Sequence, residues 1–161
     1  MLFRSAVFLV DLGTGELIWS AGGSDGHDLR LPAMRFSIPA GLRVLDLSQD
    51  GRADRIYVGD MGGQLWRFDV QNGEPASRLV QGGVIASLGG AAAGSAPPSE
   101  SLRRFYATPD VVAVFTSGER FLAVNLGSGY RAHPLSTDIQ DAFFSIRDFR
   151  VFEPIATAEY G

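Results

Sequence analysis

Hard oxygen donors recur at every second position in the segment 46–54. Side-chain oxygens stand at positions 1, 3 and 5 of this segment, a glycine at position 6 and a further carboxylate at position 9. Calcium loops place their ligands at these positions, with the main-chain carbonyl of position 7 among them and glycine at the sharp turn. The spacing therefore predicts a Ca²⁺ site whose ligands are Asp46, Ser48, Asp50 and Asp54 by side chain and Arg52 by carbonyl.

The residue at position 12 restricts the kind of calcium loop. A helix–loop–helix sensor needs a bidentate glutamate there, but Tyr57 occupies it inside an apolar run. The pattern therefore favours a compact loop in a β-hairpin, closed by Asp54. The alternative interpretation is a solvated turn without a metal. Three carboxylates in nine residues repel one another when empty, so cation binding would be coupled to local folding.

Short apolar runs separated by glycine and proline surround this loop. The chain contains 20 Gly and 8 Pro, and such frequent turn residues between short apolar runs are typical of an all-β protein. We expect strands at residues 6–11, 16–20, 42–47, 55–59, 64–70, 104–107, 111–116 and 120–125, and a pair of short strands within 79–88.

Three segments are less regular. Residues 21–41 predict a long connection with a short strand at 34–38. Residues 89–101 are almost entirely Gly, Ala, Ser and Pro, which predicts a flexible loop. The tail 137–148 fits a helical face or a strand, and the strand is favoured.

A weak recurrence favours a β-propeller over a sandwich or a barrel. The stretches 11–19 and 59–66 both run from a turn through a leucine to a tryptophan, Trp19 and Trp66. We expect these two rings in the core. Blades need about 40–45 residues, so the 161 residues predict a single domain, 1–161, that is a partial propeller of about four blades.

Composition excludes several function classes. The net charge is −4, with 45% hydrophobic and 20% charged residues and no Lys/Arg cluster, so neither nucleic-acid binding nor membrane insertion is expected. His27 and His133 lie in separate loops without cysteine, which argues against zinc. No nucleophile motif such as G-x-S-x-G occurs, so we expect no enzyme. Asp141, Arg147 and Asp148 are interpreted as surface or inter-strand pairs.

Several stretches resemble, in order, segments of the PilY1/PilC family of type IV pilus-biogenesis factors and tip-associated adhesins. They are DLSQDGRADRIYVGDMGGQLWRFD (46–69), FYATPDVV (105–112), GSGYRAHPL (127–135) and IQDAFFSIRD (139–148). The resemblance implies part of a C-terminal propeller domain with a calcium ion held by the loop 46–54. Ser48 departs from the family pattern, where aspartate or asparagine is commoner.

The resemblance also implies a function. Calcium occupancy would regulate pilus extension and retraction, twitching motility and adhesion. The partners would be pilins and minor pilins, with a host surface as a further partner. The location would be extracellular, at the pilus tip or associated with the outer membrane, in an exported parent protein.

Two alternatives stay open at this point. The stretch 11–19 resembles the blade motif of quinone-dependent dehydrogenase propellers, although the chain has only one such motif and no cysteine pair. The acidic loop also resembles a repeat of integrin-like propellers, which would make the chain a calcium-dependent adhesion module.

Overall fold

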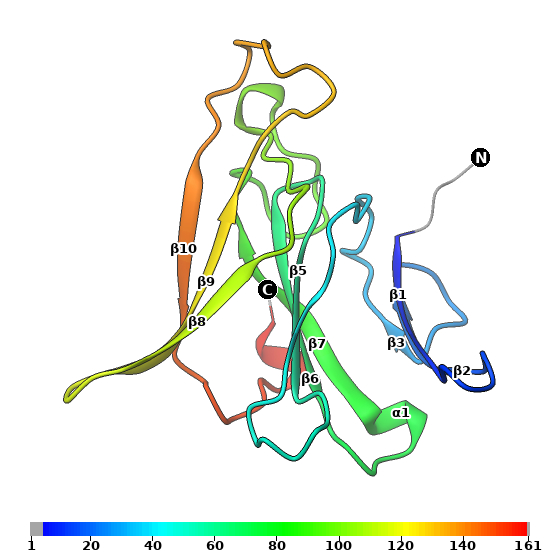
Figure 1. Ribbon diagram of the computed structural model, residues 1–161. Helices are drawn as coiled ribbons and strands as arrows, with labels where there is room; N and C mark the ends of the chain where they lie inside the picture. The colour runs from blue at the N-terminus through cyan, green and yellow to red at the C-terminus, as the bar shows by residue number, and fades with distance from the viewer. Residues whose placement is uncertain (1–4, 161) are drawn as a thin grey trace.

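The computed structural model describes residues 5–160, which form ten strands in three sheets (Figure 1). The strands are β1 (Ala6–Val10), β2 (Leu17–Gly22), β3 (Leu29–Arg30), β4 (Arg43–Leu45), β5 (Arg55–Gly59), β6 (Gln64–Val70), β7 (Val80–Ser87), β8 (Asp110–Phe115), β9 (Arg120–Gly127) and β10 (Phe143–Asp148). Helical structure in the described part of the chain is limited to the single turn α1 (Ala76–Leu79) and the 3₁₀ turns η1 (Ser99–Ser101) and η2 (Thr157–Glu159). An all-β chain is therefore confirmed.

The three sheets stand side by side, with the four-stranded sheet in the middle (Figure 1). Their strand orders are β1-β2-β3, β4-β5-β6-β7 and β10-β9-β8. All pairs are antiparallel except β2 with β3. The sheets do not close into a ring, as expected for a partial propeller, and they number three where the chain length predicted about four blades.

The middle sheet is covered on both faces, so its strands carry apolar residues without strict alternation. On one face Ile56, Trp66 and Phe68 pack against the β1-β2-β3 sheet. On the other face Tyr57 and Leu65 pack against the β10-β9-β8 sheet. All five residues of β5 are buried as a result.

Both tryptophans lie in the core, as predicted. Trp19 is 1% exposed, and its ring meets the edge of Phe68 with 6.1 Å between centroids. Trp66 is fully buried, and its indole N–H donates to Asp60 at 2.8 Å. The Asp60 carboxylate also accepts from the amide of Gly62, which fixes the β5–β6 hairpin.

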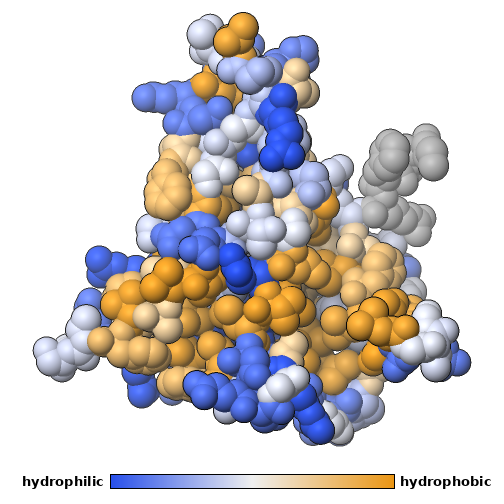
Figure 2. Space-filling view, in the orientation of Figure 1, coloured by the Kyte–Doolittle hydropathy of each residue, from blue (hydrophilic) through white to orange (hydrophobic). Residues whose placement is uncertain are grey.

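The outward faces of the end sheets carry apolar side chains. In β1, Val7 is buried, whereas Phe8 and Val10 are 53% and 50% exposed. Figure 2 shows hydrophobic residues gathered in a band across the molecule, with hydrophilic residues at its lower end. Among residues 5–160 no further sheet covers the outer faces of the two end sheets.

Two predicted strands are wrong. Residues 34–38 form none, because the amides of Met34 and Arg35 bond locally to Leu31 and Ala33, and β3 forms earlier in the chain. Residues 104–107 form none either. Phe105 is held by burial of its ring and by one main-chain bond to Asp60, without a ladder.

The predicted pair of short strands within 79–88 is also wrong, because one strand, β7, runs through Gly82 and Gly83. These glycines pair with Phe68 and Arg67 of β6. A Cβ on Gly82 would lie 2.3 Å from the Phe68 ring, and one on Gly83 would lie 2.5 Å from Tyr160. The two glycines therefore allow close packing and do not mark a turn.

Residues 89–101 contain no strand, and one polar contact fastens them to the middle sheet. The Gly94 amide donates to the side-chain oxygen of Gln64 at 2.6 Å. The flexibility of this segment stays a prediction. Strand β10 confirms the strand interpretation for the second half of the tail 137–148.

Candidate functional site: the acidic loop and the ionic network beside it

The acidic loop, residues 46–54, connects the antiparallel strands β4 and β5. Arg43 pairs with Tyr57 and Leu45 with Arg55, so the loop closes a β-hairpin as the sequence predicted. Strand β4 is shorter than expected, since it ends at Leu45. Beyond Leu45 the main-chain amides donate to carboxylates of the loop and no longer take part in strand pairing.

The Asp46 carboxylate organises the first half of the loop. Its Oδ1 accepts the amide N–H groups of Gln49 at 2.6 Å and Asp50 at 3.2 Å, and its Oδ2 accepts that of Gly51 at 2.8 Å. The hydroxyl of Ser48 lies 3.4 Å from the same Oδ1. One carboxylate thus folds the chain around itself.

The Asp54 carboxylate closes the loop from the other end. Its Oδ2 accepts the amides of Leu47 and Ser48, both at 2.7 Å. Its main chain is fixed as well, because Asp54 N donates to Leu45 O and Asp54 O accepts from Val70 of β6. Asp54 is therefore anchored to the sheet while its side chain faces the loop.

The turn needs left-handed backbone at two positions. Gly51 has φ +86°, a conformation that glycine adopts without strain, so the predicted sharp turn at position 6 is present. Gln49 has φ +62°, which is uncommon for a residue with a Cβ. Such strain persists where the surrounding bonds impose it, and the bonds to Asp46 do so here.

The five predicted ligand residues all lie in this loop, and their chemistry fits calcium. Carboxylate, hydroxyl and carbonyl oxygens are the donors that Ca²⁺ takes. Among residues 5–160, however, no three His, Cys, Asp or Glu side chains converge as a ready group for a metal. Asp54 is half-buried, whereas the other four residues are exposed: Asp46, Ser48, Asp50 and Arg52.

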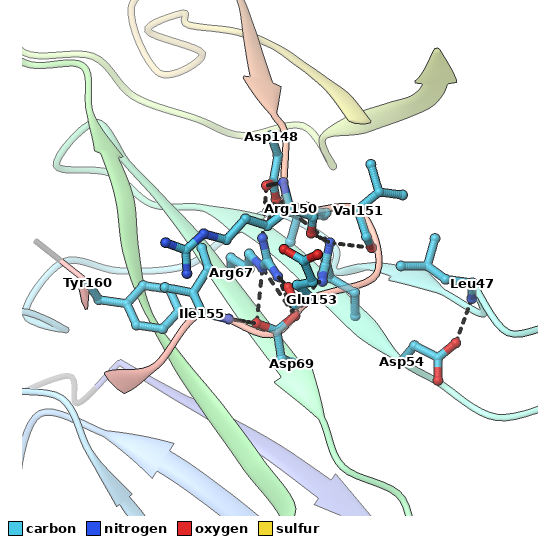
Figure 3. A network of polar contacts seen from close by, with 12 residues as sticks. Leu47, Asp54, Arg67, Asp69, Asp148, Arg150, Val151, Glu153, Ile155 and Tyr160 are labelled. Atoms are coloured by element: carbon cyan, nitrogen blue, oxygen red, sulfur yellow. Dashed lines mark hydrogen bonds and ion pairs between the residues drawn. The ribbon is translucent and has the colours of Figure 1, made fainter. Parts of the chain in front are cut away.

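A buried ionic network lies beside Asp54, the last residue of the loop (Figure 3). Arg67 of β6 is fully buried, and its guanidinium donates to Asp148 at 2.7 Å and to Asp69 at 2.9 Å. Arg55, the residue after Asp54, donates to Asp69 at 2.7 Å. Two arginines and two aspartates of opposite charge thus neutralise one another within the protein.

The network fastens the C-terminal strap, residues 149–160, to the middle sheet. Arg55 donates to the carbonyls of Arg150 at 2.8 Å, Val151 at 3.0 Å and Glu153 at 3.2 Å. Arg67 donates to the Glu153 carbonyl at 2.6 Å. The amide of Ile155 and the hydroxyl of Tyr160 both donate to Asp69 at 3.1 Å.

The sequence interpretation missed this network as a whole. Of its two interpretations of Asp148, the inter-strand pair is the one found, because Asp148 of β10 bonds to Arg67 of β6, and the residue is 8% exposed. Arg147, by contrast, forms an exposed pair with Glu119. One signal was present. Arg67 and Asp69 stand inside a strand with apolar residues on both faces, and charges in such a strand must be paired.

A cleft of about 270 Å³ separates the acidic loop from the strap. Its lining includes Ser48 and Asp54 from the loop, Arg55 and Asp69 from the network, and Phe152 and Pro154 from the strap.

Two tyrosines of the network predict how stability depends on alkaline pH. Burial, followed by the charge of Asp148, raises the pKa of Tyr57 well above its usual value of 10.0. Burial and the charge of Asp69 raise the pKa of Tyr160 in the same direction. Above pH 10 the folded chain holds protons that the unfolded chain releases, so the free energy of unfolding must fall as the pH rises.

We expect this fall in urea denaturation series taken on both sides of pH 10. A Tyr57→Phe/Tyr160→Phe variant should lose most of the added slope, because neither buried group can then ionise on unfolding. An equal slope in both proteins would show that other groups cause the alkaline loss.

The chain is similar in sequence to several known proteins. No sequence-family model matches it. The type IV pilus biogenesis factor PilY1 homolog of Xylella fastidiosa is 37% identical over 75 residues, which cover 45% of this chain and 5% of the relative. The type IV pilus biogenesis factor PilY1 of Pseudomonas aeruginosa is 35% identical over 92 residues, 52% of this chain and 7% of the relative. The chain therefore corresponds to a small part of these proteins.

The fold has a solved counterpart. The crystal structure of the Pseudomonas aeruginosa PilY1 C-terminal domain aligns with 98% of this chain and 34% of its own, with a TM-score of 0.59 and 20% identity. The three open sheets match part of that propeller domain, which confirms the predicted fold class. No helix among residues 5–160 has the length and apolar character needed to cross a membrane.

Proposed function

Because this chain belongs to the PilY1 family over about half of its length, we propose that it is a calcium-binding propeller segment of a type IV pilus biogenesis and tip-adhesion protein. Calcium occupancy of the acidic loop would regulate pilus extension and retraction, twitching motility and adhesion. The segment would act without catalysis. Its partners would be pilins, minor pilins and a host surface, at the pilus tip outside the cell or at the outer membrane.

The conformation of the acidic loop supports this proposal more than any other feature. The left-handed turn at Gly51 is formed, and the carboxylates of Asp46 and Asp54 face the loop from its two ends. A carboxylate has about four lone-pair sites. Both amides held by Asp54 bond to its Oδ2, and Asp46 Oδ2 accepts a single amide, so each carboxylate keeps one oxygen with acceptor capacity for a cation.

Calcium would be held by Asp46, Ser48, Asp50 and Asp54 through side chains and by Arg52 through its carbonyl. A bound divalent ion supplies positive charge that removes the repulsion among the three carboxylates. Asp46 and Asp54 meanwhile keep the main chain of the loop folded by accepting its amides. Ser48 is neutral, and ligand charge tunes affinity, so we expect weaker binding than with an aspartate at this position.

Thermal unfolding of the full chain tests the proposal. At a free calcium concentration of about 100 times Kd, binding to the folded state alone stabilises a protein by about 2.7 kcal/mol. For a chain of this size that corresponds to a rise in melting temperature of about 5–10 °C. We expect this rise in calcium relative to a chelator.

Magnesium serves as the matched control. It binds in stricter octahedral geometry and gives up its water reluctantly, so the same concentration should raise the melting temperature far less. A melting temperature that is the same in calcium, magnesium and chelator would contradict a calcium site in this chain.

A further inference from the structure

The loop that joins β9 to β10, residues 128–142, stands at the upper end of the molecule in Figure 1, and a pocket of about 400 Å³ lies at its base. We propose that this pocket binds an acidic saccharide, with Arg131 donating to the carboxylate of the ligand and Asp141 accepting from its hydroxyl groups. The proposal involves no metal and is independent of the acidic loop 46–54. It assigns a ligand to a part of the chain for which the sequence predicted no site.

The base of this loop is fixed by bonds within the chain. The amide of Ser128 donates to the carbonyl of Ala142 at 2.9 Å, and that of Gly129 donates to the carbonyl of Arg104 at 3.0 Å. The Ser128 hydroxyl accepts the Ala142 amide at 3.0 Å and donates to Asp141 at 2.8 Å. The pocket is therefore formed before any ligand arrives, which lowers the cost of binding.

Two tyrosine rings give the pocket an apolar lining. Tyr106 and Tyr130 are both half-buried and both border it. The guanidinium carbon of Arg104 lies 3.8 Å from the centroid of the Tyr130 ring, and that of Arg131 lies 5.4 Å from the Tyr106 centroid. These cation–π contacts restrict the two guanidinium groups without neutralising their charge.

The donors of these two arginines have no acceptor in the described part of the chain. Neither Arg104 nor Arg131 forms a hydrogen bond or an ion pair there, and their contacts are with the tyrosine rings. A guanidinium carries five N–H donors in a fork that matches a carboxylate with two parallel bonds. Although the net charge of the chain is −4, this pocket thus offers unpaired positive charge to an anion from outside.

Asp141, the other charged residue of the lining, restricts which anion fits. Its Oδ1 accepts the Ser128 hydroxyl, and no residue among 5–160 bonds to its Oδ2. A sulfate ion would bring negative charge next to this carboxylate without a proton to donate. An acidic sugar instead presents a carboxylate for Arg131, hydroxyl donors for Asp141 and C–H groups for the tyrosine rings. Small-molecule sites combine these features, apolar walls and a few placed polar groups, in pockets of roughly 300–1,000 Å³.

Calorimetric titration of the full chain with glucuronic acid at pH 7 and constant ionic strength tests the proposal. Glucose has the same ring without the carboxylate, and acetate has the carboxylate without the ring, so the two serve as matched ligands. We expect saturable binding of glucuronate with a Kd of about 1 mM or below. Because glucose cannot form the charge-assisted bonds and acetate cannot use Asp141 or the rings, each should bind at least about tenfold more weakly.

A pair of variants locates the site. Arg131→Met removes the positive charge and keeps a long side chain, and the residue is exposed without an acid partner, so the fold should be retained. Glucuronate affinity should fall by about tenfold or more, to the level of glucose. Arg120→Met is the matched control, because Arg120 is also exposed but begins β9 at the end away from Gly127, where the pocket lies. It should bind glucuronate like the unmodified chain.

Each outcome decides for or against the proposal. Preference for glucuronate over both matched ligands, lost in Arg131→Met and kept in Arg120→Met, is the result expected. Equal affinity for glucose would overturn the role of Arg131, and equal affinity for acetate would overturn a saccharide site. Tighter binding of glycine than of glucuronate would mean that Asp141 takes an ammonium group, which also overturns it. Absence of saturable glucuronate binding to the unmodified chain rejects the proposal, whatever the variants do.

Discussion

Replacement of Arg67 by methionine is expected to lower the free energy of unfolding by about 3–5 kcal/mol, the usual effect of removing one partner from a buried ion pair. The Arg67 side chain is fully buried and donates to both Asp69 and Asp148. In the variant the two aspartates would share Arg55 alone, whose nearest approach to Asp148 is 3.9 Å. Since whole domains are stable by about 5–15 kcal/mol, this is a large part of the total.

Urea denaturation measures this effect, with Arg147→Met as the matched control. Arg147 also pairs with an acid, Glu119, but both side chains are more than half exposed. Exposed pairs contribute less than about 1 kcal/mol, so the control should unfold close to the unmodified chain. Equal losses in the two variants would mean that the buried network does not stabilise the fold more than a surface pair does.

Substitution of Asp54 by alanine is expected to abolish calcium binding while leaving the strands in place. The change removes a predicted ligand and the acceptor of the Leu47 and Ser48 amides, so both the donor set and the loop conformation are lost. We expect affinity to fall by about 100-fold or more. At a calcium concentration of about 100 times the Kd of the unmodified chain, such a loss removes most of the roughly 2.7 kcal/mol by which calcium stabilises the folded state. Far-ultraviolet circular dichroism should stay close to that of the unmodified chain.

Two further variants separate charge from geometry at this position. Asp54→Asn keeps an oxygen for the two amides but loses the charge, so we expect affinity reduced by about tenfold or more. Asp25→Ala removes another exposed carboxylate, which pairs with Arg30 outside the loop, and should leave affinity unchanged. Unchanged calcium affinity in Asp54→Ala would mean that the ion, if bound, lies elsewhere in the chain.

Local patterns were sufficient to predict the elements that depend on short-range chemistry. The hairpin around the acidic loop, the strands at 55–59 and 64–70 and the burial of both tryptophans followed from alternation, turn glycines and the ligand spacing. The left-handed Gly51 followed from the same spacing. Each of these features is fixed by residues a few positions apart.

The remaining features depend on contacts between distant segments. Phe105 alternates like a strand residue but is held by its ring in a core formed with β9 and β10. Gly82 and Gly83 look like a turn, yet they continue β7 because Phe68 and Tyr160 need the space. Sequence spacing says nothing of such long-range packing.

The buried network shows the same limit most clearly. Asp148 lies 81 positions from Arg67 in the chain, and their bond depends on how the β10-β9-β8 sheet packs on the middle sheet. The charges of Arg67 and Asp69 inside a covered strand indicated that partners were needed, but not which ones. The strap that supplies several of those partners had no sequence pattern of its own.

Calorimetric titration of the full chain with calcium decides whether the acidic loop holds the ion. We expect saturable binding of a single ion that magnesium displaces poorly and that Asp54→Ala abolishes. Absence of binding heat at any calcium concentration that the folded chain tolerates, or binding that survives in Asp54→Ala, would contradict a calcium site in the acidic loop.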